Sequence, residues 1–237
     1  MKSQDLGLHT HHQFDAELEE VRAKVLQMGG LVERQLKDAL EALVNCDAAA
    51  AEQVVLNDYQ VNAMEVDIDE ECTQILALRQ PTAKDLRLVQ AITKAIADLE
   101  RIGDEAERIA RFAMNLADKC LSPDQYVELE HLGKHVREML HDSLDAFARM
   151  DVNVAIHLGR EDKSVDKEYE SVLRQTVTFM MEDPRYIPQC LDILWCARAL
   201  ERIGDRSCNI GEYVIYFVRG KNVRHTTLEE MEREARG

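Results

Sequence analysis

The sequence predicts an all-α protein made of two tandem three-helix bundles related by an internal repeat. Apolar residues recur at helical steps, as in Val89, Ile92 and Ile96, and no segment alternates like a β-strand. Ten Gly and four Pro in 237 residues are too few for the turns of an all-β protein. The hexamer LERIGD stands at residues 99–104 and again at 200–205, which indicates a repeat.

Short breaks divide the chain into long helical segments. Asn45 and Cys46 end the first segment, and Asp47 can cap the second. Pro81 ends the second segment, and Thr82 can begin a capping box for the third. The six predicted helices span residues 13–45, 47–79, 83–119, 124–149, 151–181 and 188–219.

The second half of the chain contains similar signals for the starts and ends of helices. Residues 122–125 (SPDQ) combine an N-cap Ser with a Pro at the first helical position, and Asp151 can cap the next helix. Pro184 and Pro188 bracket the last break. Helices of about 30 residues are about 45 Å long, and short loops make them antiparallel neighbours in a bundle.

The repeat defines the domains. The hexamer recurs after 101 residues, and Asp47 and Asp58 recur as Asp151 and Asp162 after 104 residues. Helices one to three therefore correspond to helices four to six. We expect repeats at residues 13–120 and 124–220, with tails at 1–12 and 221–237.

Composition limits the classes of partner. The net charge of −16 disfavours binding to nucleic acid and to anionic membranes. The chain has no run of 18 apolar residues and its first residues do not resemble a signal peptide. Six cysteines without a CxxC pair predict reduced, mostly core thiols in a cytoplasmic protein. We also expect Trp195 and Phe179 in the core.

The repeated hexamer places two carboxylates on one side of each third helix. The pairs are Glu100 with Asp104 and Glu201 with Asp205, each at i and i+4. They lie on the flank of the apolar stripe. Gly103 lies between the carboxylates and the core, where a missing side chain permits another helix to approach.

The second helix of each repeat carries matching acids. Asp58, Glu65 and Asp69 form one stripe together with Asn62, and Asp162 and Asp166 form the other. If the second and third helices pack antiparallel, the stripes meet, and oxygen-only clusters suit Mg²⁺, Mn²⁺, Ca²⁺ or iron. The alternative is a solvated acidic face without a ligand.

Other chemistry is weakly indicated. Glu128 and His131, and Glu138 and His141, match the ExxH spacing of di-iron proteins, but both pairs lie on one helix, so we expect surface histidines. The sequence contains no phosphate-binding loop, nucleophile elbow or zinc-finger spacing. We therefore expect no enzyme; a metal-carboxylate enzyme or metal store, and a purely structural spacer, are the alternatives.

These motifs resemble those of the PhoU family of bacterial phosphate-transport accessory and regulatory proteins. The doubled hexamer is the specific marker, and residues 13–19 (QFDAELE), 85–88 (DLRL) and 145–149 (DAFAR) also resemble family stretches. The resemblance implies a cytoplasmic negative regulator of the phosphate-starvation response. Its implied partners are the ATPase subunit of the phosphate ABC transporter and the sensor histidine kinase. It further implies a homodimer and bound divalent cations, such as Mg, Mn, Fe or Zn.

The family's metal motifs fall on the same acids. Glu100 and Asp104, Glu201 and Asp205, and Asp162 and Asp166 match the paired motifs, whereas Asp58 is followed at i+4 by Asn62. Arg108 also stands where the second repeat has Asn209. The neutral amide and the added positive charge predict that the second repeat binds a cation more tightly.

Overall fold

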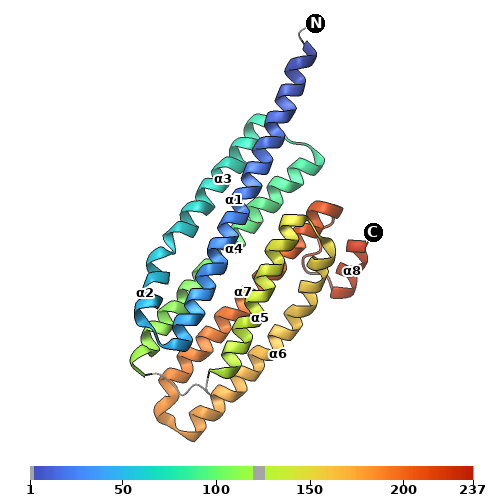
Figure 1. Cartoon of the computed structure of the whole chain (residues 1–237). Helices are drawn as coiled ribbons and strands as arrows, with labels where there is room; N and C mark the ends of the chain where they lie inside the picture. Colours follow the sequence, from blue (N-terminus) through green and yellow to red (C-terminus); the bar gives the residue numbers. More distant parts are fainter. Residues whose placement is uncertain (1–2, 120–125, 237) are drawn as a thin grey trace.

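The computed structural model describes residues 3–119 and 126–236, with side chains for 14–119 and 126–235, and confirms two helical bundles (Figure 1). The first bundle comprises α1 (Ser3–Asn45), α2 (Ala48–Asn57), α3 (Tyr59–Arg79) and α4 (Ala83–Leu116), followed by a 3-10 turn at Ala117–Lys119. The second comprises α5 (Val127–Arg149), α6 (Val152–Glu182) and α7 (Ile187–Arg219), with a 3-10 turn at Pro184–Tyr186. A final helix, α8 (Leu228–Arg236), follows.

Two of the predicted helix caps form. Asp47 Oδ1 accepts a hydrogen bond from the Ala50 amide at 2.9 Å, and Asp151 Oδ1 accepts one from Asn153 at 2.8 Å. Thr82 occupies the N-cap of α4, but its side chain makes no cap hydrogen bond, so the predicted capping box is wrong. The start signal at 122–125 lies outside the described residues.

The second predicted helix is broken in two. Asp58 separates α2 from α3, whereas its counterpart Asp162 lies inside the continuous α6. At the break, the Val61 amide bonds to the Asp58 carbonyl at 2.9 Å, three residues back, which tightens the backbone into one 3-10 turn. The break therefore falls on one of the predicted cation ligands.

Both predicted tails contain helix. Residues 3–12 belong to α1, and α8 lies within 221–237 beside α6 (Figure 1). Met231 and Ala235 of α8 are buried. A Cβ added to Gly159 would lie 3.1 Å from Leu228 Cδ1, so this glycine permits the close approach of α8.

The two hexamer helices meet in the middle of the molecule. α4 packs against α7, and α1 also contacts α5, so a single contiguous core runs through both bundles. Their interface contains two buried acids, Asp98 and Glu105, whose side chains are 4% and 7% exposed. Arg206 donates to Asp98 at 3.3 Å and Arg202 donates to Glu105 at 3.0 Å.

Further polar contacts complete this interface. The Tyr213 hydroxyl donates to Asp98 Oδ2 at 2.7 Å, and Arg108 donates to Glu105 Oε2 at 3.0 Å. Each buried acid therefore accepts hydrogen bonds from two side chains. Such bonds offset the cost of removing a carboxylate from water. The bundles are joined by specific ion pairs as well as by apolar packing.

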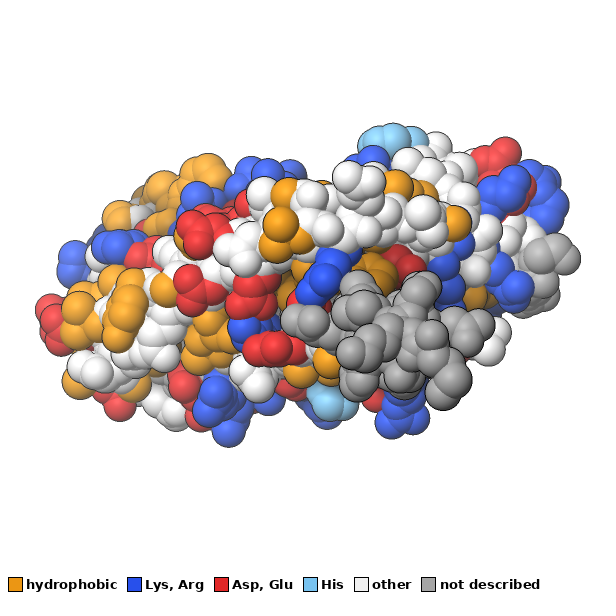
Figure 2. Space-filling model, turned by 90° about the horizontal axis from the view of Figure 1, so that it is seen from above, with side chains coloured by type: hydrophobic (Ala, Val, Ile, Leu, Met, Phe, Trp, Pro, Cys, Tyr) orange, Lys and Arg blue, Asp and Glu red, His pale blue; other side chains and the backbone are white. Residues whose placement is uncertain are grey.

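The structure differs from expectation at three side chains, one of which is Phe179, half-buried and not in the core. Trp195 is 56% exposed, so its predicted place in the core is wrong. Cys46 is disulfide-bonded, so the prediction of reduced thiols is wrong there, whereas Cys72, Cys190, Cys196 and Cys208 are free. Seen from above, acidic, basic and apolar side chains are interspersed (Figure 2). Within residues 3–119 and 126–236, no helix is long and apolar enough to cross a bilayer.

Candidate functional site: two acidic clusters

The first acidic cluster lies where α4 passes the break between α2 and α3. Glu100 and Asp104 come from α4, Asp58 stands at the break, and Glu65 comes from α3. Asp58 raises the pKa of both α4 acids, and Glu65 raises that of Glu100, after the larger effect of burial. These charges are therefore near one another, as the packing of the predicted stripes requires.

The second acidic cluster lies between α6 and α7. It contains Asp162 and Asp166 from α6 and Glu201 and Asp205 from α7. Burial, followed by repulsion from the other three carboxylates, raises the pKa of Asp162 to about 6. Burial and neighbouring acids also raise the pKa values of Glu201 and Asp205.

The hexamer glycines allow these helices to come close. A Cβ at Gly103 would lie 3.2 Å from Val61 Cγ1 and 3.5 Å from Asp58 Oδ1. A Cβ at Gly204 would lie 3.3 Å from Val165 Cγ1. The predicted role of Gly103 in helix approach is confirmed, and Gly204 has the same role in the second repeat.

The two clusters differ in the groups that donate hydrogen bonds to their acids. Asp58 accepts hydrogen bonds from Gln35 at 2.7 Å and from Asn62 at 3.1 Å, both neutral amides. In the second cluster, Arg198 donates to Glu201 Oε1 at 2.5 Å, whereas Glu201 Oε2 is buried with no hydrogen-bond partner among the described residues. Arg108 pairs with Glu105, and its charge only partly offsets burial and the neighbouring acids, which raise the pKa of Asp104.

The acids suit a hard cation in chemistry but do not form a closed cage. Their ligands are carboxylate oxygens, and Glu201 Oε2 has no competing donor. Yet among the described side chains, no three His, Cys, Asp or Glu residues are close enough together to hold a metal ion. Any cation would therefore be held partly by water, or would require the carboxylates to move.

Access to the second cluster is open. A cleft of about 530 Å³ exposes Asp162 and Asp205 beside the guanidinium groups of Arg198, Arg202 and Arg206. Acidic and basic side chains therefore line the same opening. The opening therefore presents both positive and negative groups to solvent.

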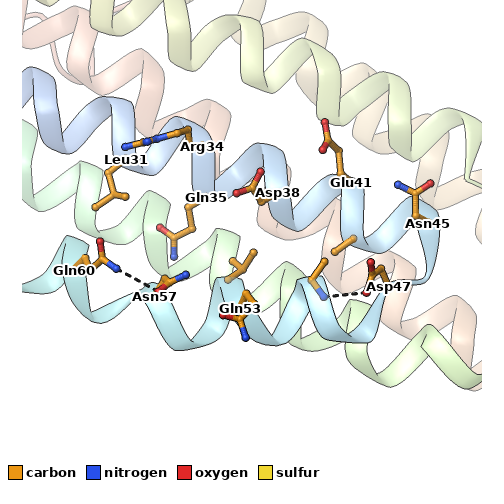
Figure 3. A pocket seen from close by; sticks show the side chains of 13 residues that line it. Leu31, Arg34, Gln35, Asp38, Glu41, Asn45, Asp47, Gln53, Asn57 and Gln60 are labelled. Carbon is orange, nitrogen blue, oxygen red and sulfur yellow. Dashed lines mark hydrogen bonds between the residues drawn. The ribbon is translucent and has the colours of Figure 1, made fainter.

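A second cleft adjoins the first cluster (Figure 3). Its volume is about 610 Å³, and it lies between α1 and α2. Gln35 links it to the acids, because its Nε2 donates to Asp58 while its Oε1 is buried without a partner among the described residues. The other polar lining residues are Arg34, Asp38, Glu41, Asn45, Asp47, Gln53, Asn57 and Gln60.

Among the side chains that the structure describes, the histidines do not join a group that could hold a metal ion. His131 and His141 are exposed, as expected. His135, on the same helix, is only 16% exposed. It lies 2.9 Å from Glu168 and 2.9 Å from Glu161, and connects α5 to α6. Neither the histidines nor these glutamates belong to the acidic clusters.

Sequence reasoning missed three polar residues around the site. Asp98 and Glu105 stand seven residues apart, each directly before an apolar stripe position, and that spacing was an available signal. Gln35 carried no signal, because its importance depends on where α1 passes Asp58.

Comparison with known proteins identifies the family. The PhoU domain matches the chain twice, at residues 25–113 and 129–214. The chain belongs to the PhoU family. This PhoU chain is 52% identical over 237 residues to a "Phosphate-specific transport system accessory protein PhoU homolog" from Pseudomonas putida, covering 100% of the chain and 93% of the relative. It is 52% identical over 233 residues to the Escherichia coli K12 accessory protein PhoU, covering 98% and 96%.

Solved PhoU structures have the same fold. The crystal structure of PhoU from Pseudomonas aeruginosa matches with a TM-score of 0.85 and 54% identity, covering 88% of this PhoU chain and 100% of the other. The phosphate transport system regulatory protein PhoU from Streptococcus pneumoniae matches with a TM-score of 0.82 and 33% identity, covering 89% and 99%. Two tandem helical bundles are therefore the architecture of this family member.

Proposed function

We propose that this PhoU-family chain is an accessory and regulatory protein of a phosphate transport system. One observation carries the proposal: relatives of that name match it at 52% identity along nearly their whole length. The long helices support it, because they form a stiff platform with several faces for protein contacts.

The finer role follows from the family resemblance. The chain acts in the cytoplasm as a homodimer and a negative regulator of the phosphate-starvation response. It couples the ATPase subunit of the phosphate ABC transporter to the sensor histidine kinase and restrains phosphate uptake. In this proposal it acts by binding other proteins and not by catalysis.

The acidic clusters bind a divalent cation, such as Mg²⁺, Mn²⁺, Fe²⁺ or Zn²⁺, and the second cluster binds it more tightly. The unpartnered Glu201 Oε2 and the raised pKa of Asp162 support this, because a cation would relieve the repulsion among the carboxylates. In the first cluster, Asn62 stands where the second has a carboxylate.

The regulatory role is tested by complementation. A bacterial strain that lacks its own PhoU-family gene should express starvation genes in abundant phosphate, and this chain should restore repression. Repression is read from a reporter fused to a starvation promoter. Failure to repress, with normal protein level and helical content, would overturn the regulatory role.

The cation is tested separately by titration calorimetry of EDTA-treated protein with Mn²⁺ and Mg²⁺. Asp166→Ala should reduce binding more than Asp58→Ala, and Glu201→Gln should also reduce it. Exposed Asp67→Asn is the matched control, since Asp67 belongs to neither cluster. Equal loss in the Asp58 and Asp166 variants would contradict the predicted order of the sites.

A further inference from the structure

Six large apolar side chains are exposed together on the hairpin of α6 and α7. Each helix contributes a row that steps by four residues, which places the row on one side of its helix. The rows are Leu173, Val177 and Met181 on α6, and Ile187, Leu191 and Trp195 on α7. All six are at least 38% exposed, and Met181 reaches 80%. We call them the α6–α7 apolar face.

The two rows lie on the same side of the hairpin. The Arg198 guanidinium is 5.9 Å from the centroid of the Tyr169 ring. Tyr169 precedes the α6 row by four residues, and Arg198 follows Trp195 by three. Because α6 and α7 are antiparallel, this contact places the two rows side by side between Tyr169 and the connection of the two helices. The connection lies at the lower end of the molecule (Figure 1).

The internal repeat shows that the fold does not require this face to be apolar. The corresponding positions in the first repeat are Asp69, Thr73, Ala77, Leu86, Gln90 and Lys94. In the first repeat, part of this surface contacts α7. The Tyr216 hydroxyl of α7 donates to Gln90 at 2.7 Å, and Lys94 lies 5.2 Å from the Tyr216 ring centroid. The second repeat instead presents apolar groups to solvent, where they are unfavourable unless a partner covers them.

The free charges beside the face are negative. Arg174 pairs with Glu170, and Arg185 pairs with Asp183. Glu182 and Asp192 also flank the rows. Among the described residues, neither has an ion-pair or hydrogen-bond partner, and burial raises the pKa of Asp192.

We infer that the α6–α7 apolar face is the docking surface for an amphipathic helix of a partner protein, one with an apolar stripe flanked by Lys or Arg. Two neighbouring rows of exposed apolar side chains offer a surface on which the apolar stripe of one helix can pack. The basic flanks would pair with Glu182 and Asp192. The inference rests on the proposed function, since it assigns the contact with a regulatory partner to this face.

Two other occupants fit the charges less well. A second copy of the chain in a symmetric pair would bring its own Glu182 and Asp192 against the same acids, and each copy carries a charge of −16. An anionic lipid surface would be repelled by the same carboxylates. A basic amphipathic helix satisfies both the apolar rows and the free acids.

Trp195 is the only tryptophan of the chain, so it reports on this face alone. Full-length protein labelled with 5-fluorotryptophan gives one ¹⁹F resonance. We expect it to shift on adding the transporter ATPase subunit or the detergent-solubilised sensor kinase. Val177→Ser with Leu191→Ser should weaken binding at least about 10-fold. Leu56→Ser with Leu78→Ser, two exposed leucines of the first bundle, is the matched control and should leave binding unchanged.

The outcomes separate this inference from the proposed function. Unchanged affinity in the face variant, with normal helical content, overturns the inference and leaves the function standing. If neither protein binds the wild type, the proposed coupling fails and a synthetic peptide decides the inference. An 18-residue helix with Leu on one face and Lys on its flanks should shift the resonance, and a Glu-flanked version should bind at least about 10-fold more weakly.

Three results would overturn the proposal in favour of another occupant or none. The Lys-flanked peptide could leave the resonance unchanged. The resonance could shift with protein concentration alone, which indicates a second copy. It could shift on adding phosphatidylglycerol–phosphatidylcholine vesicles, which indicates a lipid surface.

Discussion

At the scale of single residues, burial decides the electrostatics of the acidic clusters. Asp162 lies among Asp166, Glu201 and Asp205, and burial acts together with their charges to raise its pKa to about 6. An acid whose pKa is higher in the folded protein destabilises the fold when it is ionised. The cluster therefore carries a stability cost above pH 6 that a bound cation would remove.

Asp162→Asn should stabilise the cation-free protein by about 1 kcal/mol at pH 7.5, because it removes the repelling charge. The unfolded pKa is about 3.8, so the gain should decline as pH falls from 6 towards 4 and vanish below it. Urea unfolding in EDTA at pH 7.5 and pH 4 measures this. Asp67→Asn, outside the clusters, should change neither value, and destabilisation at pH 7.5 in EDTA would contradict the prediction.

The contribution of His135 to folding stability depends on pH in the opposite direction. It lies between Glu161 and Glu168, and the hydrogen bonds to these carboxylates raise its pKa above 6.5, outweighing the lowering effect of burial. Its charged contacts are therefore complete below pH 6.5 and are lost as pH rises through the raised value.

His135→Gln should cost about 1 kcal/mol of unfolding free energy at pH 6 and less at pH 9, because only the protonated ring forms charge-assisted bonds to both glutamates. Chemical denaturation at the two pH values is the measurement. The exposed His141→Gln serves as the control, with a smaller change expected. An equal loss at both pH values would mean that packing alone explains the effect.

At the scale of helices, α4 and α7 hold the two repeats together. Their interface combines apolar packing with Asp98 and Glu105, each buried and held by two donors. Breaking a buried ion pair is costly, because it leaves the partner charge without compensation.

Asp98→Ala should destabilise the protein by about 3 to 5 kcal/mol, since Arg206 and Tyr213 both lose their acceptor. Tyr213→Phe removes only one donor and should cost about 1 kcal/mol. Denaturant unfolding of both variants gives the comparison. Similar losses in the two variants would show that the Arg206 pair contributes little.

Helix boundaries show what local signals can predict. Asp47 and Asp151 cap the helices that follow them, as expected, because a carboxylate can accept hydrogen bonds from the first amides of the next helix. The break at Asp58 could not be predicted in this way. It coincides with a hydrogen bond from Gln35 of α1, a residue 23 positions away. Helix α8 is similarly supported by packing against α6 beside Gly159.

At the scale of the whole molecule, the two repeats share one contiguous core. We expect them to unfold together, because α4 and α7 cannot separate without exposing their common interface. Trp195 fluorescence reports on the second bundle, and far-ultraviolet circular dichroism reports on all helices. Their midpoints in urea should coincide, and two separated midpoints would show that the bundles unfold independently.

The sequence by itself determined the helical class, the repeat, the acidic pair on each third helix and the family resemblance, because periodicity and motif identity can be read along a single chain. Only the tertiary structure decided that Asp98 and Glu105 are buried between the bundles and that Trp195 is exposed. The reason is physical. A helical pattern shows which side of a helix is apolar, but burial depends on which neighbouring helix covers that side, and this is set by packing between distant segments.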